Sequence, residues 1–195
     1  LGSIFEDIGK LATKEGAQLI IMGTHGQKGF QKLFMSYAMQ VITSCDIPFV
    51  IVQKNTPIRN LNKIVIPIDL TKESLQVVNI AGDLATMFDA EIHVIGEKQT
   101  DEHLNITLKN RIYIINNRYE ERHIKCHIEQ VKSGGSYSTK VLEYAEKNNI
   151  DMLAIAYHTE SILPQFDKFA QNLITNEKML PCLVLNSKLA SSLYY

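Results

Sequence analysis

The stretch 19–29 constrains the fold more than any other part of the chain. Its apolar run 19–22 passes directly into a loop that carries Gly23, Gly26 and Gly29, and apolar residues then recur with helical spacing. A strand, a glycine loop and a helix together can hold a phosphate, because glycines let the backbone come close and a helix start offers free N–H groups. A tight strand-to-helix turn needs the same glycines, so both roles stay open.

Short apolar runs alternate with amphipathic segments along the rest of the chain, which predicts an α/β fold. Such a fold has a parallel sheet with helices on both faces and right-handed crossovers. Binding sites in these sheets lie at the carboxyl ends of strands. The partial alternation in 124–131 predicts an outer strand. We expect strands at 18–22, 48–52, 63–69, 90–96, 124–131, 151–156 and 181–186. We expect helices at 4–15, 29–44, 103–122, 137–147 and 165–177, and one after Thr71 whose inward apolar residues run from 78 to 88.

The sequence also contains an internal repeat. A shift of 133 positions brings His25 onto His158 and Pro48 onto Pro181 without a gap. Residues 1–53 therefore copy the last part of a unit that occurs whole at about 62–187. A partial unit exposes sheet edges and apolar helix faces, so we expect it to pack on the complete unit or on another chain.

Two segments resemble the universal stress protein family. Residues 17–26, AQLIIMGTHG, followed by Pro48-Phe-Val-Ile-Val at 48–52, resemble the second part of such a domain, and residues 63–69, KIVIPID, are similar to its start. The resemblance implies a Rossmann-like fold of the adenine nucleotide alpha hydrolase type, with five parallel strands, plus a partial second copy. The predicted organisation is the end of a first domain at 1–55, a linker at 56–62, a complete domain at 63–188 and a tail at 189–195.

The same resemblance suggests a nucleotide site. Members that bind ATP carry Gly-x2-Gly-x9-Gly-Ser/Thr around the phosphates and an aspartate after the first strand. Here the first two glycines are present, but Ser36 and Tyr37 stand where Gly-Ser/Thr would fall, and the histidine belongs to the loop. The candidate nucleotide-binding residues are therefore Gly23, His25, Gly26, Ser36, Tyr37, Pro67 and Asp69.

Neither copy has a complete set of these residues. The complete unit has Ala-Tyr-His-Thr-Glu at 156–160, which lacks glycine and places Glu160 where a phosphate would sit. The glycine loop lacks an aspartate of its own. A composite site, with Asp69 facing Gly23 and Gly26, would require the first-copy fragment to insert where a unit's own second half normally lies. Asp69 can equally serve to stabilise the turn after its strand.

We therefore predict a stress-response binding and regulatory module with a degenerate nucleotide site. The alternative is an ATP-binding stress protein that hydrolyses ATP slowly, and ATP is the only cofactor that we consider. No catalytic residues are predicted, because no nucleophile–base pair is evident. Family members often pair through their last strands, so we expect a homodimer or larger assembly through 48–52 and 181–186.

Charge and cysteine content limit which partners and which cellular location we expect. The formal net charge is −1, without a Lys/Arg stripe, which argues against nucleic acid and anionic membranes as partners. No apolar run approaches membrane-spanning length. Cys45, Cys126 and Cys182 are far apart in apolar stretches, which is typical of reduced, buried thiols in a cytoplasmic protein.

One pair of histidines invites a metal interpretation. His127 lies in the strand predicted at 124–131, and His123 directly precedes it. In an extended chain the two histidines would lie on the same face, with Cys126 next to His127. Four residues of strand separate these two side chains by roughly 13 Å, which is too far for one ion. We therefore predict no metal site.

Overall fold

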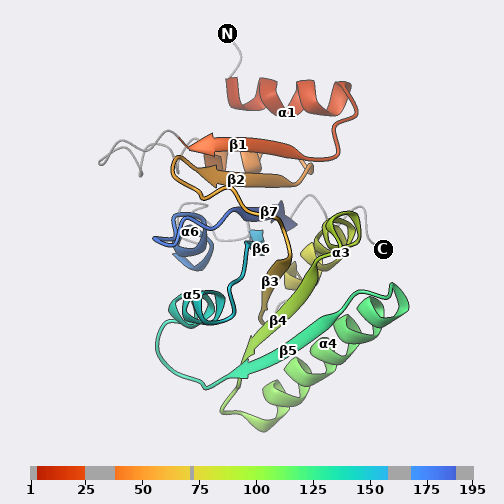
Figure 1. Ribbon diagram of the computed structural model, residues 1–195, viewed down its shortest axis with the longest axis vertical. Helices are drawn as coiled ribbons and strands as arrows, with labels where there is room; N and C mark the ends of the chain where they lie inside the picture. The colour runs from red at the N-terminus through yellow and green to blue at the C-terminus, as the bar shows by residue number, and fades with distance from the viewer. Residues whose placement is uncertain (1–3, 25–37, 71–72, 158–167, 188–195) are drawn as a thin grey trace.

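A computed structural model of the chain describes residues 4–24, 38–70, 73–157 and 168–187. The strands in these ranges form one seven-stranded sheet in the order β1-β2-β7-β6-β3-β4-β5 (Figure 1). The strands are β1 (Ile20–Thr24), β2 (Phe49–Gln53), β3 (Lys63–Ile68), β4 (Glu91–Glu97), β5 (Cys126–Val131), β6 (Met152–Tyr157) and β7 (Cys182–Asn186).

Five of the strands form the parallel sheet that the sequence predicts. β7, β6, β3, β4 and β5 are all parallel, and β5 lies at the outer edge as expected. β1 and β2 are parallel to each other and extend this sheet on its other side. They join it through an antiparallel seam in which Phe49 pairs with Val184 and Ile51 with Cys182. The predicted fold, a parallel sheet of five strands with a partial second copy, is confirmed.

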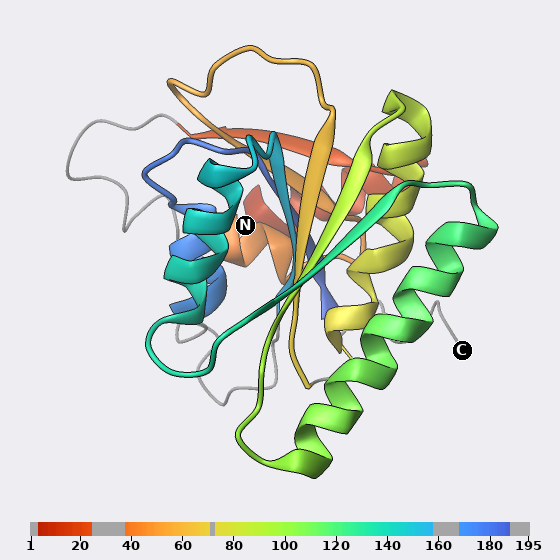
Figure 2. The same ribbon diagram turned by 60° about the horizontal axis from the view of Figure 1, so that its bottom comes forward.

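Helices cover both faces of the sheet, which also matches the prediction (Figure 2). α5, α6 and the helical residues 38–42 pack on one face, and α3 and α4 pack on the other. Each face has its own core of buried aliphatic side chains, as the continuous apolar runs of the inner strands require. The helices are α1 (Ile4–Lys14), the 3-10 turn η1 (Glu73–Leu75), α3 (Val77–Phe88), α4 (Glu102–Glu121), α5 (Tyr137–Lys147) and α6 (Lys168–Ile174).

The repeat is visible in the positions of these elements. The 133-residue shift carries the bounds of α1 onto those of α5, and the bounds of β2 onto those of β7. α1 packs on the same face of the sheet as α5, through Ile8 and Ala12. On β1, Ile21 is 70% exposed, an apolar side chain left open to solvent by the partial copy. The division of the chain into domains stays a prediction.

The segment between β2 and β3 is fixed to the complete copy by polar contacts. Gln53 donates from Nε2 to the carbonyl of Asn176 at 2.8 Å, and Thr56 donates from its hydroxyl to the carbonyl of Met179 at 2.9 Å. Asp151 accepts the backbone N–H groups of residues 62 and 63 at 3.0 and 3.1 Å. The predicted linker is therefore held against the end of the sheet. Among the described helices, none has both the length and the apolar character needed to cross a membrane.

Candidate functional site

The carboxyl ends of β3 and β6 form a small cavity, at the edge of the sheet where the sequence places Pro67 and Asp69. Its volume is about 100 Å³. Sites for drug-sized ligands usually measure about 300–1,000 Å³, so the part of the cavity that the described residues line is small for a nucleotide. The lining residues are Pro67, Ile68, Asp69, Ser74, Tyr137, Ile155, Ala156 and Phe169.

The aromatic side chain of Tyr137 limits this cavity. Its hydroxyl lies 3.0 Å from the carbonyl of Ile68 and 2.7 Å from that of Ile95, so one proton is shared between the ends of β3 and β4. Its ring stacks on Phe169 of α6, with centroids 5.2 Å apart and 12° between the planes. Burial, and next the charge of Asp69, raise the pKa of Tyr137, so its hydroxyl remains a donor at neutral pH.

The polar groups at this cavity come from the turn that follows β3. The carbonyl of Asp69 accepts a hydrogen bond from Nη1 of Arg111 at 3.3 Å, which ties the turn to α4. The side chain of Asp69 is half-buried, and Ser74 is buried in η1. A carboxylate and a hydroxyl at the end of a strand are suited to bind the hydroxyl groups of a sugar. Asp69 therefore lies in the turn after β3, as the sequence predicts, and also lines the cavity.

Gly23 lies far from this cavity. It is in β1, and three strands separate β1 from β3 in the sheet. Because β2 is antiparallel to β7, the carboxyl end of β1 also faces the opposite edge of the sheet from the carboxyl end of β3. The structure therefore does not bring Gly23 and Asp69 together within one chain, and no composite site forms between them. His25, Gly26, Ser36, Tyr37 and the loop residues 158–160 lie outside the described residues.

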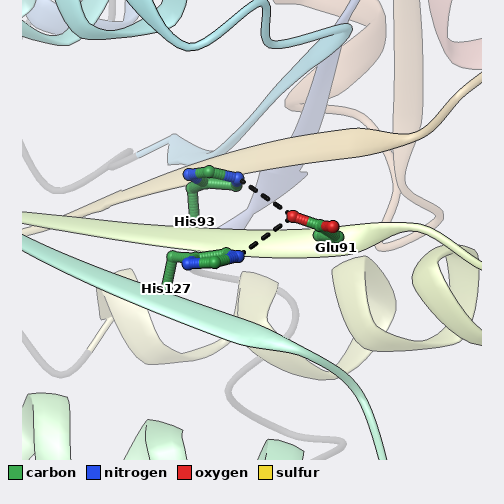
Figure 3. A group of neighbouring side chains, drawn as sticks. All are labelled: Glu91, His93 and His127. Atoms are coloured by element: carbon green, nitrogen blue, oxygen red, sulfur yellow. Dashed lines mark hydrogen bonds and ion pairs between the residues drawn. The ribbon is translucent and has the colours of Figure 1, made fainter.

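A second group of polar side chains was missed by the sequence analysis. Glu91 and His93 of β4 and His127 of β5 point toward one another on the face of the sheet that α5 covers (Figure 3). Their candidate ligand atoms all lie within 4.8 Å of one another. His123, which the sequence analysis paired with His127, precedes β5 in a turn with φ of 56°. Of the two histidines that the sequence suggests as a pair, only His127 belongs to this group.

Burial and charge determine how this group ionises. Burial, and next the positive charge of His127, lower the pKa of His93 to about 4, so its imidazole is neutral at pH 7. A hydrogen bond from Lys125 lowers the pKa of Glu91 below its ordinary value, and His127 acts in the same direction. The group therefore combines a neutral buried imidazole with an ionised carboxylate.

A comparison with protein families and one with solved structures point to the same family. The family model described as the universal stress protein family matches residues 1–53 and 60–176. Among curated proteins, none matches the chain.

Several solved structures share the fold. One is a universal stress protein from Archaeoglobus fulgidus DSM 4304, with a TM-score of 0.74 and 16% identity over 95% of this chain; the chain spans 66% of that protein's length. A second is a universal stress protein from Archaeoglobus fulgidus in complex with dAMP, with a TM-score of 0.53 and 12% identity over 66% of this chain and 100% of that one. A third, in complex with cAMP, has a TM-score of 0.54 and 16% identity over 66% of this chain and 99% of that one.

Proposed function

Because the chain belongs to the universal stress protein family, we propose that it is a stress-response binding and regulatory module with a reduced nucleotide site. The site is the cavity at the carboxyl ends of β3 and β6. The observation that carries the proposal is its volume of about 100 Å³, with the ring of Tyr137 beside it. The proposal includes no catalytic role.

Two facts support a nucleotide site at this position. Solved universal stress proteins of the same fold are described in complex with dAMP and with cAMP. The cavity of this chain also lies at the strand ends where parallel sheets of this class bind ligands, with Asp69 and Ser74 on its wall. The ring of Tyr137 must move before a nucleoside can enter, and that movement breaks its bonds to the ends of β3 and β4. Affinity falls by the cost of that rearrangement.

Equilibrium binding of labelled ATP and AMP to the full chain tests the proposal. We expect no binding of either nucleotide tighter than about 1 mM, because few contacts remain available in so small a cavity. Tyr137→Ala should enlarge the cavity and strengthen binding by about tenfold or more. Tyr113→Ala is the matched control, because that tyrosine is 66% exposed on α4. Binding by the unmodified chain in the micromolar range would contradict the proposal.

The alternative is an ATP-binding stress protein with slow hydrolysis. The presence of Asp69 in the cavity wall favours it. If this alternative holds, the unmodified chain binds ATP and releases phosphate slowly, and Asp69→Asn lowers both signals while the fold is retained. The same binding experiment therefore separates the two candidates.

We also propose that the chain self-associates, but through strands other than β2 and β7, the two for which the sequence predicts it. β2 and β7 already pair with each other, and each has another neighbour in the sheet. The outer strands of the described sheet are β1 and β5, and unpaired outer strands are sites of association. Light scattering at micromolar concentration tests this proposal, and a monomer would argue against it. The cytoplasmic location and the absence of a nucleic-acid or membrane partner stay predictions from composition.

A further inference from the structure

We propose that Glu91, His93 and His127 form a binding site for a divalent transition-metal ion, with Zn²⁺ as the ion best suited to this donor set. The site lies on β4 and β5, near their amino ends, under α5. Two imidazole nitrogens and one carboxylate oxygen are the protein ligands of a well-known class of zinc site, in which a water or another ligand fills the fourth position. This inference is independent of the nucleotide cavity, which lies at the carboxyl ends of the strands.

Strand register brings the three side chains together. His93 and His127 occupy paired positions of the parallel strands β4 and β5, so their side chains stand next to each other on one face. Glu91 precedes His93 by two residues and therefore shares that face. The two imidazole rings stack with centroids 4.6 Å apart and 27° between their planes, and both direct Nε2 toward Glu91 (Figure 3). Tetrahedral zinc holds its ligand atoms roughly 3.4 Å apart, so small side-chain rotations close the site.

The hydrogen bonding of His93 leaves one nitrogen available for a ligand. The residue is 5% exposed, and its Nε2 has no hydrogen-bond partner among the residues that the structure describes. Oε2 of Glu91 is 3.8 Å from this nitrogen, beyond hydrogen-bonding distance. Its Nδ1 lies 2.8 Å from the hydroxyl of Tyr144 on α5. Metal-binding histidines typically hydrogen-bond through the nitrogen that does not bind the metal, so Tyr144 fits the role of a positioning residue.

The two carboxylate oxygens of Glu91 have different partners, which leaves Oε2 on the side of the histidines. Oε1 of Glu91 accepts a bond from Lys125 at 2.6 Å, while Oε2 lies 3.0 Å from Nε2 of His127. A metal ion between Oε2 and the two imidazoles takes the place of the proton now shared by Glu91 and His127. Two lysines oppose the ion: the charge of Lys63 reaches His93, and so does that of Lys125, whose side chain is 64% exposed and can turn toward solvent.

The fourth position of the proposed site faces outward. The side chain of His127 is 42% exposed, and β5 is the outer strand of the described sheet. The metal would therefore keep one coordination position accessible to water or to a ligand from solution. A binding module with such a site could respond to the supply of zinc, in addition to any nucleotide.

Zinc binding to the full, chelator-treated chain tests this inference. Competition with a chromophoric chelator should show one Zn²⁺ per chain, with a dissociation constant below about 10 μM. His127→Gln should weaken binding by at least about tenfold, because it removes one of three ligands. His127 is half-exposed, so this variant is expected to fold, and circular dichroism verifies that it does. Cobalt should give the intense visible absorption of a four-coordinate ion with the unmodified chain and lose it with His127→Gln.

Two matched variants distinguish this site from incidental binding. His103→Gln removes an exposed histidine of α4. Cys126→Ser removes the thiol of the residue next to His127; that thiol packs against the core on the other face of the sheet. Both should bind zinc like the unmodified chain. The inference is overturned if the unmodified chain binds no zinc tighter than about 100 μM, if His127→Gln binds as well as the unmodified chain, or if Cys126→Ser abolishes binding.

Discussion

The buried hydroxyl of Tyr119 ties α4 to α3. It donates to the carbonyl of Val78 at 2.7 Å, and the side chain is fully buried. Tyr119→Phe should lower the free energy of unfolding by about 1–2 kcal/mol, because the carbonyl loses its partner in a place that water does not reach. Urea denaturation measures the change. Tyr113→Phe is the control on the same helix, since that ring is 66% exposed, and an equal loss in both variants would contradict the interpretation.

The cysteines make a second test at the residue scale. Cys45 and Cys182 are buried, and burial raises the pKa of both thiols. In the native chain we expect both to resist alkylation by iodoacetamide at pH 8, because the reagent needs an accessible thiolate. Mass spectrometry before and after unfolding in urea measures the modification. Rapid modification of Cys182 in the native chain would show that this part of the core opens easily.

Individual residues also show where sequence reasoning stops. The apolar segments around Cys45, Cys126 and Cys182 predicted three buried thiols; Cys45 and Cys182 are buried, whereas Cys126 is only partly buried. The group of Glu91, His93 and His127 depends on the register between two strands, which single-sequence patterns do not specify. Two histidines in consecutive predicted strands were the available signal.

At the scale of single elements, α4 begins with a well-formed cap. Asp101 has extended backbone angles, and its carboxylate accepts the N–H of Leu104 at 2.9 Å. Asp101→Ala should lower the free energy of unfolding by about 1 kcal/mol, whereas Asp101→Asn should lose only a few tenths, because asparagine caps equally well. Thermal denaturation of the two variants measures the difference. Equal losses would mean that charge, rather than the cap, stabilises this helix end.

The elements themselves were predicted well and their arrangement less so. The predicted α5 at 137–147 matches the structure, because two glycines and apolar periodicity mark it. The start of β2 is one residue from its predicted place, because a short continuous apolar run marks it. The antiparallel seam between β2 and β7 follows from no local pattern, because it joins residues far apart in sequence. That seam is also why Gly23 and Asp69, both correctly expected at carboxyl ends of strands, lie at opposite edges of the sheet.

At the scale of the molecule, Phe49 tests whether the two copies unfold together. Its side chain is fully buried and belongs to a core that includes Val184, its partner across the seam. Phe49→Ala should lower the free energy of unfolding by about 3–5 kcal/mol, because it leaves a cavity in that shared core. We expect one cooperative transition in urea, shifted as a whole.

The control for this prediction lies in the segment between the copies. Ile58 is fully exposed there, so Ile58→Ala should change the free energy of unfolding by no more than about 0.5 kcal/mol. Two separate transitions, of which Phe49→Ala moves only the first, would show that the partial copy unfolds by itself.

The seam also has a consequence for how the molecule behaves on dilution. β2 and β7 belong to one chain, and the segment 54–62 that follows β2 is held at the end of the complete copy. Their pairing is therefore an intramolecular event, with an effective concentration on the order of millimolar. Two separate chains that paired through the same strands would dissociate as their concentration fell. In this chain the pairing of β2 with β7 does not depend on protein concentration.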